Sequence, residues 1–141
     1  MKLLIINGPH LNLLGLRDPE IYGKQNYAAL CAIIKETCES LDVEFEIFQS
    51  NHEGAIIDKL HSARLNFDGV IINAGAYTHY SYAIRDAISA IKIPCIEVHI
   101  SNVFARDAFR SESVIAPACK GSISGFGFGS YYLAVQALAE L

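Results

Sequence analysis

The sequence lacks several features that mark common functional classes. No apolar run approaches the roughly 18 residues that a membrane span needs, and the few basic residues are scattered through a chain of net charge −4. A nucleic-acid surface is therefore not expected, because such surfaces gather Lys and Arg on one face. Met1 leads into a short apolar run that is too brief for a signal-peptide core, so a cytoplasmic protein is expected.

The cysteines show no metal or redox spacing. There are four, and none forms a CxxC pair. Cys31 and Cys38 are seven residues apart on one face of a predicted helix, which suits small buried side chains better than a disulfide or a zinc site. No metal is expected.

Several catalytic signatures are also missing. The chain has no GxxxxGK[ST] phosphate loop and no GxSxG nucleophile elbow, and the NGPH that starts at Asn7 lacks the glycines of a dinucleotide fingerprint. The later GFGFGS, which begins at Gly125, precedes the last predicted helix with no acidic strand after it. We interpret it as a close-packing turn.

What is present predicts an α/β fold. Short apolar runs predict strands at 3–7, 43–48, 69–73, 94–100 and 121–124. The charged alternation VEFEIF places the second of these near a sheet edge. Strand and helix alternate in one domain, 1–141, with 52% hydrophobic residues. This order predicts a doubly wound, five-stranded parallel sheet in a three-layer, flavodoxin-like arrangement.

Helices fill the intervals between these strands. We expect the first to be capped by Asn26 and to run to about Ser40, with Leu30, Ile33, Ile34 and Leu41 at helical spacing. A second opens near Glu53, and its inward residues are expected to be Ile56, Ile57, Leu60 and Leu65. The others are expected at 82–91 and 130–141.

The stretch from Gly8 to Gly23, GPHLNLLGLRDPEIYG, interrupts this pattern as a long loop extending to about residue 25. Its two Pro and three Gly oppose a regular helix, yet it is rich in aliphatic side chains. Loops of this length in compact domains are often lids over an active site. A closing lid can bring Arg17 against the phenol of Tyr22. The alternative is a connector that packs on the core and leaves both side chains at the surface.

Polar side chains stand where the apolar strands end. Asn73 ends one strand with His79 soon after, and Glu97, His99 and Ser101 end the next. Ligands bind at the carboxyl ends of strands in doubly wound sheets. Alternation places Glu97 and His99 on one face, where a carboxylate can hold the tautomer of the imidazole and raise its pKa. A purely structural histidine is the alternative.

Two arginines follow the same strand. Arg106 and Arg110 are four residues apart, so they can share one helical face. Together with the lid and the histidines, they indicate proton-transfer chemistry on a small anion.

Three blocks of the sequence resemble the type II 3-dehydroquinate dehydratases. They are NGPHLNLLGLRDPEIYG, NAGAYTHYSYAIRDA and EVHISNVFARDAFR, and the similarity runs along the whole chain. The resemblance implies trans elimination of water from 3-dehydroquinate through an enolate to give 3-dehydroshikimate. It also implies no cofactor, and a dodecamer built from trimers.

The resemblance also implies catalytic roles. Tyr22 corresponds to the base and His99 to the acid that protonates the departing hydroxyl. Arg17 corresponds to the lid arginine that favours the tyrosinate, and Arg106 to a second arginine near it. Glu97 corresponds to the partner of the histidine.

Further positions match substrate-binding groups of the family: Asn73, His79, Asp86, Arg110 and the backbone N–H groups of Ile100 and Ser101. The resemblance implies that Asp86 comes from a neighbouring subunit. His10 departs from the family pattern, which usually has an Asn that helps to hold a water near the enolate oxygen. Imidazole can donate one hydrogen bond there. Two alternatives are a flavodoxin-like module that binds a nucleotide or flavin, and an inactive oligomeric homologue.

Overall fold

A computed structural model describes residues 1–16 and 25–141. Its centre is a parallel five-stranded sheet with the strand order β2-β1-β3-β4-β5. The strands are β1 (Lys2–Asn7), β2 (Glu44–Gln49), β3 (Gly69–Asn73), β4 (Cys95–His99) and β5 (Gly121–Ser124). This order confirms the predicted flavodoxin-like sheet, and β2 lies at an edge as its charged alternation indicates.

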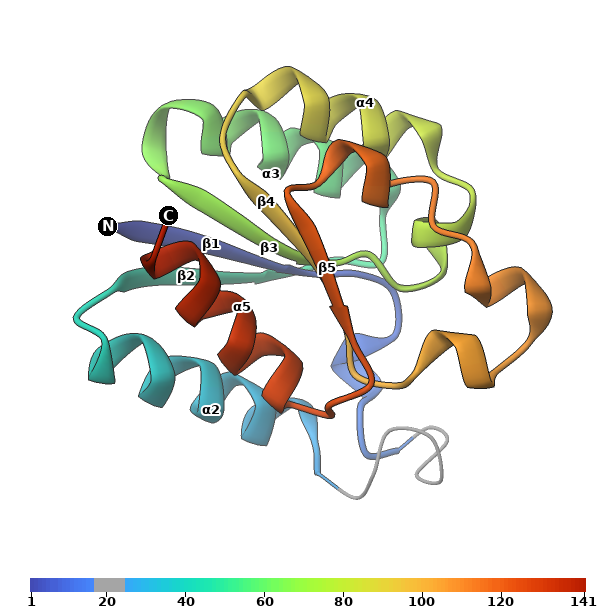
Figure 1. The fold of residues 1–141 in the computed structure, drawn as a ribbon, viewed down its shortest axis with the longest axis horizontal. Helices are drawn as coiled ribbons and strands as arrows, with labels where there is room; N and C mark the ends of the chain where they lie inside the picture. Colours follow the sequence, from blue (N-terminus) through green and yellow to red (C-terminus); the bar gives the residue numbers. More distant parts are fainter. Residues whose placement is uncertain (17–24) are drawn as a thin grey trace.

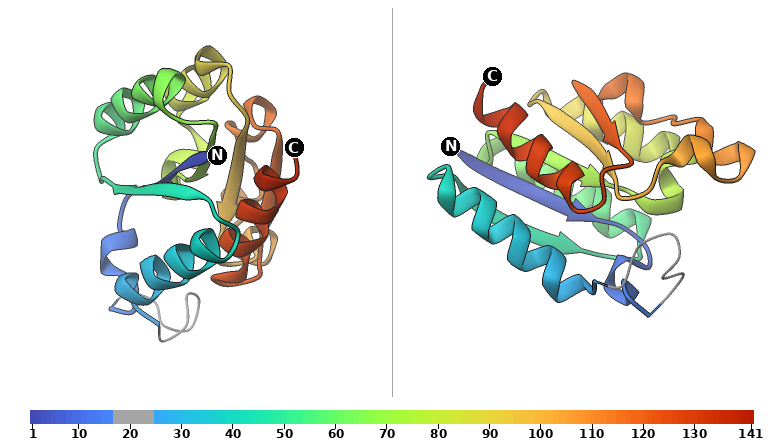
Figure 2. Two further views of the ribbon diagram at one scale, coloured as in Figure 1. Left: turned by 90° about the vertical axis from the view of Figure 1, so that its left-hand side faces the viewer. Right: turned by 60° about the horizontal axis from the view of Figure 1, so that its bottom comes forward.

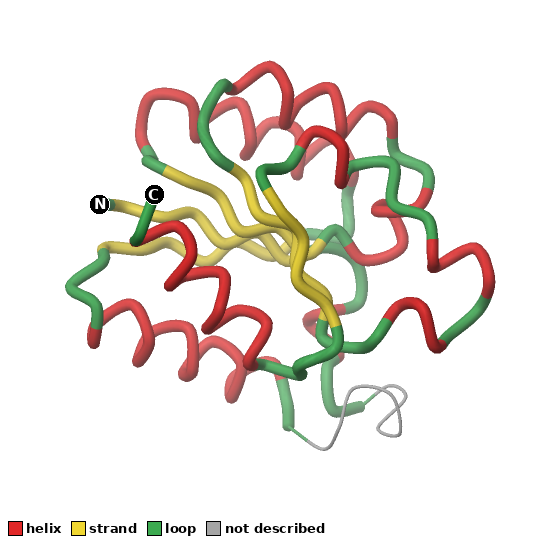
Figure 3. The backbone as a smooth tube through the Cα atoms, in the orientation of Figure 1, coloured by secondary structure: helices red, strands yellow, loops and turns green. Residues whose placement is uncertain are grey.

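Two layers of helices cover the sheet (Figure 1). The helices are α2 (Tyr27–Ser40), α3 (Glu53–Asn66), α4 (Tyr82–Ile91) and α5 (Gly129–Ala139). Figures 2 and 3 show α2 and α5 together on one face of the sheet, with α3 and α4 on the other. Within the described part of the chain, no helix is long and apolar enough to cross a membrane.

Side chains cap two of these helices. The Asn26 side chain accepts a hydrogen bond from the Ala29 N–H at 2.9 Å, as predicted. The Ser81 hydroxyl does the same for Ile84 at 3.1 Å. Each cap satisfies one of the N–H groups that have no partner in the first turn of a helix.

The strands divide their side chains between two cores. In β1, Leu3 and Ile5 pack with α2 and α5, whereas Leu4 and Ile6 pack with α3 and α4. Successive side chains of a strand point to opposite faces, so a strand covered on both sides is apolar throughout. The same alternation decides which polar residue at a strand end faces which layer.

One predicted inward residue, Leu65, is wrong, and Leu41 of the predicted helical pattern lies outside its helix. Leu65 is 84% exposed and Leu41 is 39% exposed. From the buried Leu60, the apolar stripe of α3 continues at Ala63, three residues on, and a step of five residues carries Leu65 away from it. Leu41 lies just after the end of α2, where Cys38 completes the buried stripe.

Candidate active site

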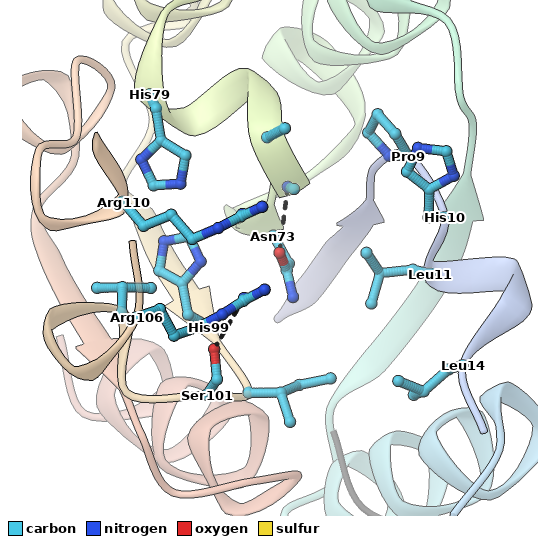
Figure 4. A pocket seen from close by; sticks show the side chains of 14 residues that line it. Pro9, His10, Leu11, Leu14, Asn73, His79, His99, Ser101, Arg106 and Arg110 are labelled. Atoms are coloured by element: carbon cyan, nitrogen blue, oxygen red, sulfur yellow. Dashed lines mark hydrogen bonds between the residues drawn. The ribbon is translucent and has the colours of Figure 1, made fainter. Parts of the chain in front are cut away.

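A pocket opens at the carboxyl ends of β1, β3 and β4, where the strand order reverses. Figure 4 shows its walls, which come from the segments that follow these three strands. The lining residues are Pro9, His10, Leu11, Leu14, Asn73, Gly75, Ala76, His79, His99, Ile100, Ser101, Val103, Arg106 and Arg110. The topological switch point is where this class of fold binds its ligands, so the pocket lies where the topology predicts it.

His99 and Glu97 form a buried pair at the end of β4. The two residues are on the same face of the strand, and His99 Nε2 lies 3.6 Å from Glu97 Oε1. The Glu97 carboxylate also accepts hydrogen bonds from the hydroxyls of Ser113 and of Ser122, the latter at 2.7 Å. Burial favours a higher pKa for Glu97, but the bonds from His99 and the two serines outweigh it, and the pKa lies below its ordinary value. The carboxylate is therefore ionised behind the imidazole.

His79 stands beside His99 on the pocket wall. Their ring centroids are 6.4 Å apart, and His79 Nδ1 lies 2.7 Å from the carbonyl oxygen of Glu112. A carbonyl only accepts hydrogen bonds, so Nδ1 carries the proton and Nε2 is left as an acceptor in the neutral ring. Burial lowers the pKa of His79 and favours this neutral form.

Arg106 and Arg110 bring positive charge to the pocket. Arg106 donates a hydrogen bond to the Ser101 hydroxyl at 3.3 Å. Arg110 Nε lies 3.4 Å from Asp107 Oδ2, and its guanidinium stacks over Phe109. These cations make the pocket suitable for an anionic ligand.

The predicted single helical face for the two arginines is wrong. Arg106 has an extended backbone and follows the short 3₁₀ turn η3 (Val103–Ala105). Arg110 belongs to a second short turn, η4 (Ala108–Ser111). The chain bends between them, yet both side chains line the pocket.

The described part of the long loop forms the opposite wall. Leu11 and Leu14 are buried against the core, whereas Leu13 and Leu16 are exposed. A short 3₁₀ turn, η1 (Leu11–Leu13), follows His10, which has a φ of 70° in the left-handed region. The His10 backbone N–H donates a hydrogen bond to the Asn51 side chain at 3.1 Å.

The predicted site residues do not all lie in this pocket. Glu97 lies behind His99 rather than on the pocket wall, and Asp86 is exposed on α4, outside the lining. Arg17 and Tyr22 lie outside the described residues. The other predicted site residues line the pocket together.

Some residues that support the site gave no signal in the sequence. Ser113 and Ser122 hold Glu97, but single serines far along the chain have no recognisable spacing. The GFGFGS stretch forms a turn, as predicted, but the prediction of close packing is wrong for Gly127, where an added Cβ would meet no atom within 4 Å. The N–H groups of Gly125 and Gly127 donate to the carbonyls of His99 and Ile100, and both glycines have positive φ.

This site carries three histidines, two arginines and a buried carboxylate. Nowhere in residues 1–16 and 25–141 do three or more His, Cys, Asp or Glu side chains gather as metal ligands would. The fold and the pocket define a flavodoxin-like α/β protein that gathers side chains capable of acid–base chemistry at the carboxyl ends of its strands.

Comparisons with known proteins identify the family. Residues 1–139 match the family model described as dehydroquinase class II. The chain is 60% identical over 141 residues to a 3-dehydroquinate dehydratase of Caldicellulosiruptor saccharolyticus, covering 99% of this chain and 97% of that one. It is 58% identical over 139 residues to one of Bacillus cereus, covering 99% and 95%.

A solved structure agrees with this match. The type II dehydroquinase of Butyrivibrio crossotus superposes with a TM-score of 0.97 at 55% identity, over 98% of this chain and 97% of that one. The chain therefore belongs to the class II dehydroquinase family.

Proposed function

We propose that the pocket at the ends of β1, β3 and β4 is the active site for the 3-dehydroquinate dehydratase activity of this family. The chain is a lyase of the shikimate pathway, with 3-dehydroquinate as its substrate. The observation that carries the site assignment is the pairing of His99 with the ionised Glu97 in a pocket lined by two arginines.

In this proposal His99 is the general acid. Its Nε2 faces Glu97, which leaves Nδ1 as the nitrogen available to the substrate. In this role His99 acts as the imidazolium, with its Nε2 proton towards Glu97 and its Nδ1 proton towards the departing hydroxyl. Hydroxide is a poor leaving group, and protonation lets it leave as water.

The proposed base is Tyr22, with Arg17 and Arg106 as its cationic partners. The ordinary pKa of tyrosine is about 10, so a useful tyrosinate fraction near neutral pH needs a shift of roughly 2 to 3 units, or about 3 to 4 kcal/mol. Cations in a site that excludes water can supply this. The membership of the chain in the class II dehydroquinase family supports this assignment. The tyrosinate removes the proton beside the ketone, and the resulting enolate expels the hydroxyl.

The remaining lining residues are proposed to hold the substrate. His79 Nε2 suits a ring hydroxyl, because its Nδ1 proton faces the carbonyl of Glu112. Arg110 and Asn73 offer donors to ring oxygens, and the backbone N–H groups of Ile100 and Ser101 are proposed to bind the carboxylate. His10 lines the same pocket and is proposed to serve the water site of the family's Asn.

We also propose that residues 1–141 form one catalytic domain, with the lid at about 8–25, in a dodecamer of trimers. Asp86 is exposed on α4, so its proposed contact with substrate requires a neighbouring subunit. Exposed aromatic side chains are compatible with buried contacts between copies: Tyr80, Tyr82, Phe104, Phe109 and Phe126. A cytoplasmic location stays a prediction.

Turnover of 3-dehydroquinate by the purified full chain tests this proposal. The product has a conjugated enone, whose ultraviolet absorbance reports the reaction. We expect the absorbance to rise with the unaltered protein and to stay flat with Tyr22→Phe, which keeps the ring and removes the acid–base group. Tyr132→Phe, on the exposed side of α5, serves as the matched control. Near-normal turnover by Tyr22→Phe would exclude Tyr22 as the base.

A further inference from the structure

A chain of buried hydrogen bonds lies beneath the pocket and ends on one of its walls. Asn7 and Asn73 are register partners at the ends of β1 and β3. The Tyr131 hydroxyl of α5 bridges their side chains, at 2.7 Å from Asn7 Oδ1 and 3.0 Å from Asn73 Nδ2. We call these three residues the amide–tyrosine network. Asn73 belongs to the pocket wall, whereas Tyr131 lies below it.

The backbone sets the direction of every bond in this network. The Gly75 N–H can only donate, and it lies 3.2 Å from Asn73 Oδ1. The Asn73 amide must therefore turn its NH₂ group towards Tyr131. The tyrosine oxygen accepts that bond and gives its single proton to Asn7. Asn7 then points its own NH₂ group at the Tyr27 hydroxyl, 3.3 Å away.

Burial keeps this arrangement in one state. Tyr131, Asn7 and Asn73 are 0%, 0% and 5% exposed, so water cannot replace a missing partner. Burial also raises the pKa of Tyr131, against the smaller opposing effect of its bond from Asn73, and the hydroxyl keeps its proton. Tyr131 holds the nitrogen of the Asn73 amide and Gly75 holds its oxygen, and together with the covalent bond to Cβ these two contacts fix the amide plane.

The network leaves one N–H group of the Asn73 side chain for a ligand in the pocket. An amide nitrogen carries two N–H groups, and Tyr131 takes only one of them. The second N–H belongs to a side chain that lines the pocket next to Gly75 and Ala76. A ligand oxygen, such as a ring hydroxyl, is the group that this donor fits.

We propose that Tyr131 is a positioning residue of the reaction, because its buried hydroxyl fixes the Asn73 amide so that an N–H of that amide points at an oxygen of the bound substrate. This proposal rests on the proposed role of Asn73 in substrate binding. Tyr131 itself does not touch the substrate, and it acts through Asn73.

Steady-state kinetics of Tyr131→Phe with 3-dehydroquinate test the proposal. We expect kcat/KM to fall about tenfold, the effect of one misaligned buried hydrogen bond, with KM raised. Tyr132→Phe is the matched control, because it removes the adjacent hydroxyl of α5, which accepts an exposed hydrogen bond from Gln136. We expect kcat/KM of that control to stay within twofold of the unaltered protein.

A double-mutant cycle separates positioning from a general loss of packing. If Tyr131 acts through Asn73, then adding Tyr131→Phe to Asn73→Ala changes kcat/KM less than twofold. Losses that multiply in the double variant, or a folded Tyr131→Phe with unchanged kcat/KM, would overturn the proposal. If Tyr131→Phe does not fold, Asn7→Ala replaces it in the cycle. That substitution removes the acceptor of the Tyr131 proton, and the same lack of additivity with Asn73→Ala is expected.

The variants also separate the positioning role of Tyr131 from the proposed role of Asn73 in substrate binding. Lower kcat/KM in Asn73→Ala with no effect of Tyr131→Phe contradicts the positioning role and leaves the proposed site intact. Unchanged kcat/KM in Asn73→Ala contradicts the proposed role of Asn73 in binding, and with it the role of Tyr131.

Discussion

Glu97 Oε1 lies 3.6 Å from His99 Nε2 at the buried end of β4, and the two residues are separated by a single position. This contact follows from strand geometry, because side chains two residues apart point to the same face. The Ser113 hydroxyl donates to the same carboxylate oxygen, Oε1, and the Ser122 hydroxyl donates to Oε2. The imidazole therefore has one nitrogen committed to Glu97 and one available to the pocket.

Glu97→Gln is expected to reduce turnover while the protein stays folded. The amide has nearly the same shape, but it lacks the charge that stabilises the imidazolium, so kcat should fall at least about tenfold. Glu112→Gln is a suitable control, because only the backbone carbonyl of Glu112 contacts His79. A Glu97→Gln variant with more than half the unaltered kcat would show that the carboxylate is not needed for proton transfer.

The pKa of His79 predicts a pH dependence of stability. Burial lowers this pKa below the ordinary value of 6.5, so the unfolded chain binds the proton first as the pH falls. The contribution of His79 is therefore fully present above pH 6.5 and is lost as the pH falls through the lower folded-state pKa. Urea unfolding between pH 5 and 8 measures the free energy of unfolding. As the pH falls, this free energy should decrease less for His79→Gln than for the unaltered protein. His61 lies on the exposed face of α3, so in His61→Gln the free energy of unfolding should depend on pH as it does in the unaltered protein. The same pH dependence in all three proteins would contradict the prediction.

His10→Asn is expected to stabilise the fold. The φ of 70° at His10 lies in the left-handed region, which Asn adopts more readily than most residues. We expect a gain of about 0.5 kcal/mol in the free energy of unfolding. His10→Ala also removes the imidazole ring, but alanine does not adopt the left-handed backbone more readily. This variant should therefore show no gain in the free energy of unfolding. A lower stability for His10→Asn than for His10→Ala would contradict this explanation.

The sequence predicted the sheet and most of the polar side chains that line the pocket, for identifiable reasons. The GVIIN and LLIIN runs are apolar throughout because helices cover both sides of β3 and β1, and Asn7 and Asn73 mark the strand ends. The alternation of Glu97 and His99 predicted their contact. These features depend on local periodicity, which a sequence displays directly.

The features that the sequence did not predict include contacts between segments far apart in the chain. Tyr131 contacts Asn7 across 124 positions, and nothing near Tyr131 in the sequence distinguishes it from an ordinary core aromatic. The bend between Arg106 and Arg110 was missed because a spacing of four residues fits a helix equally well. Leu65 is apolar like the core residues, but its angle on α3 points it to solvent, where it is 84% exposed.

The most direct measurement is the rate at which 3-dehydroquinate is converted to its enone product by His99→Gln. We expect a loss in kcat of about 100-fold or more, the usual contribution of a general acid. His52→Gln, which alters an exposed histidine just before α3, should retain the unaltered rate. A folded His99→Gln variant that retains more than half of the unaltered rate would contradict the central claim that this histidine protonates the leaving hydroxyl.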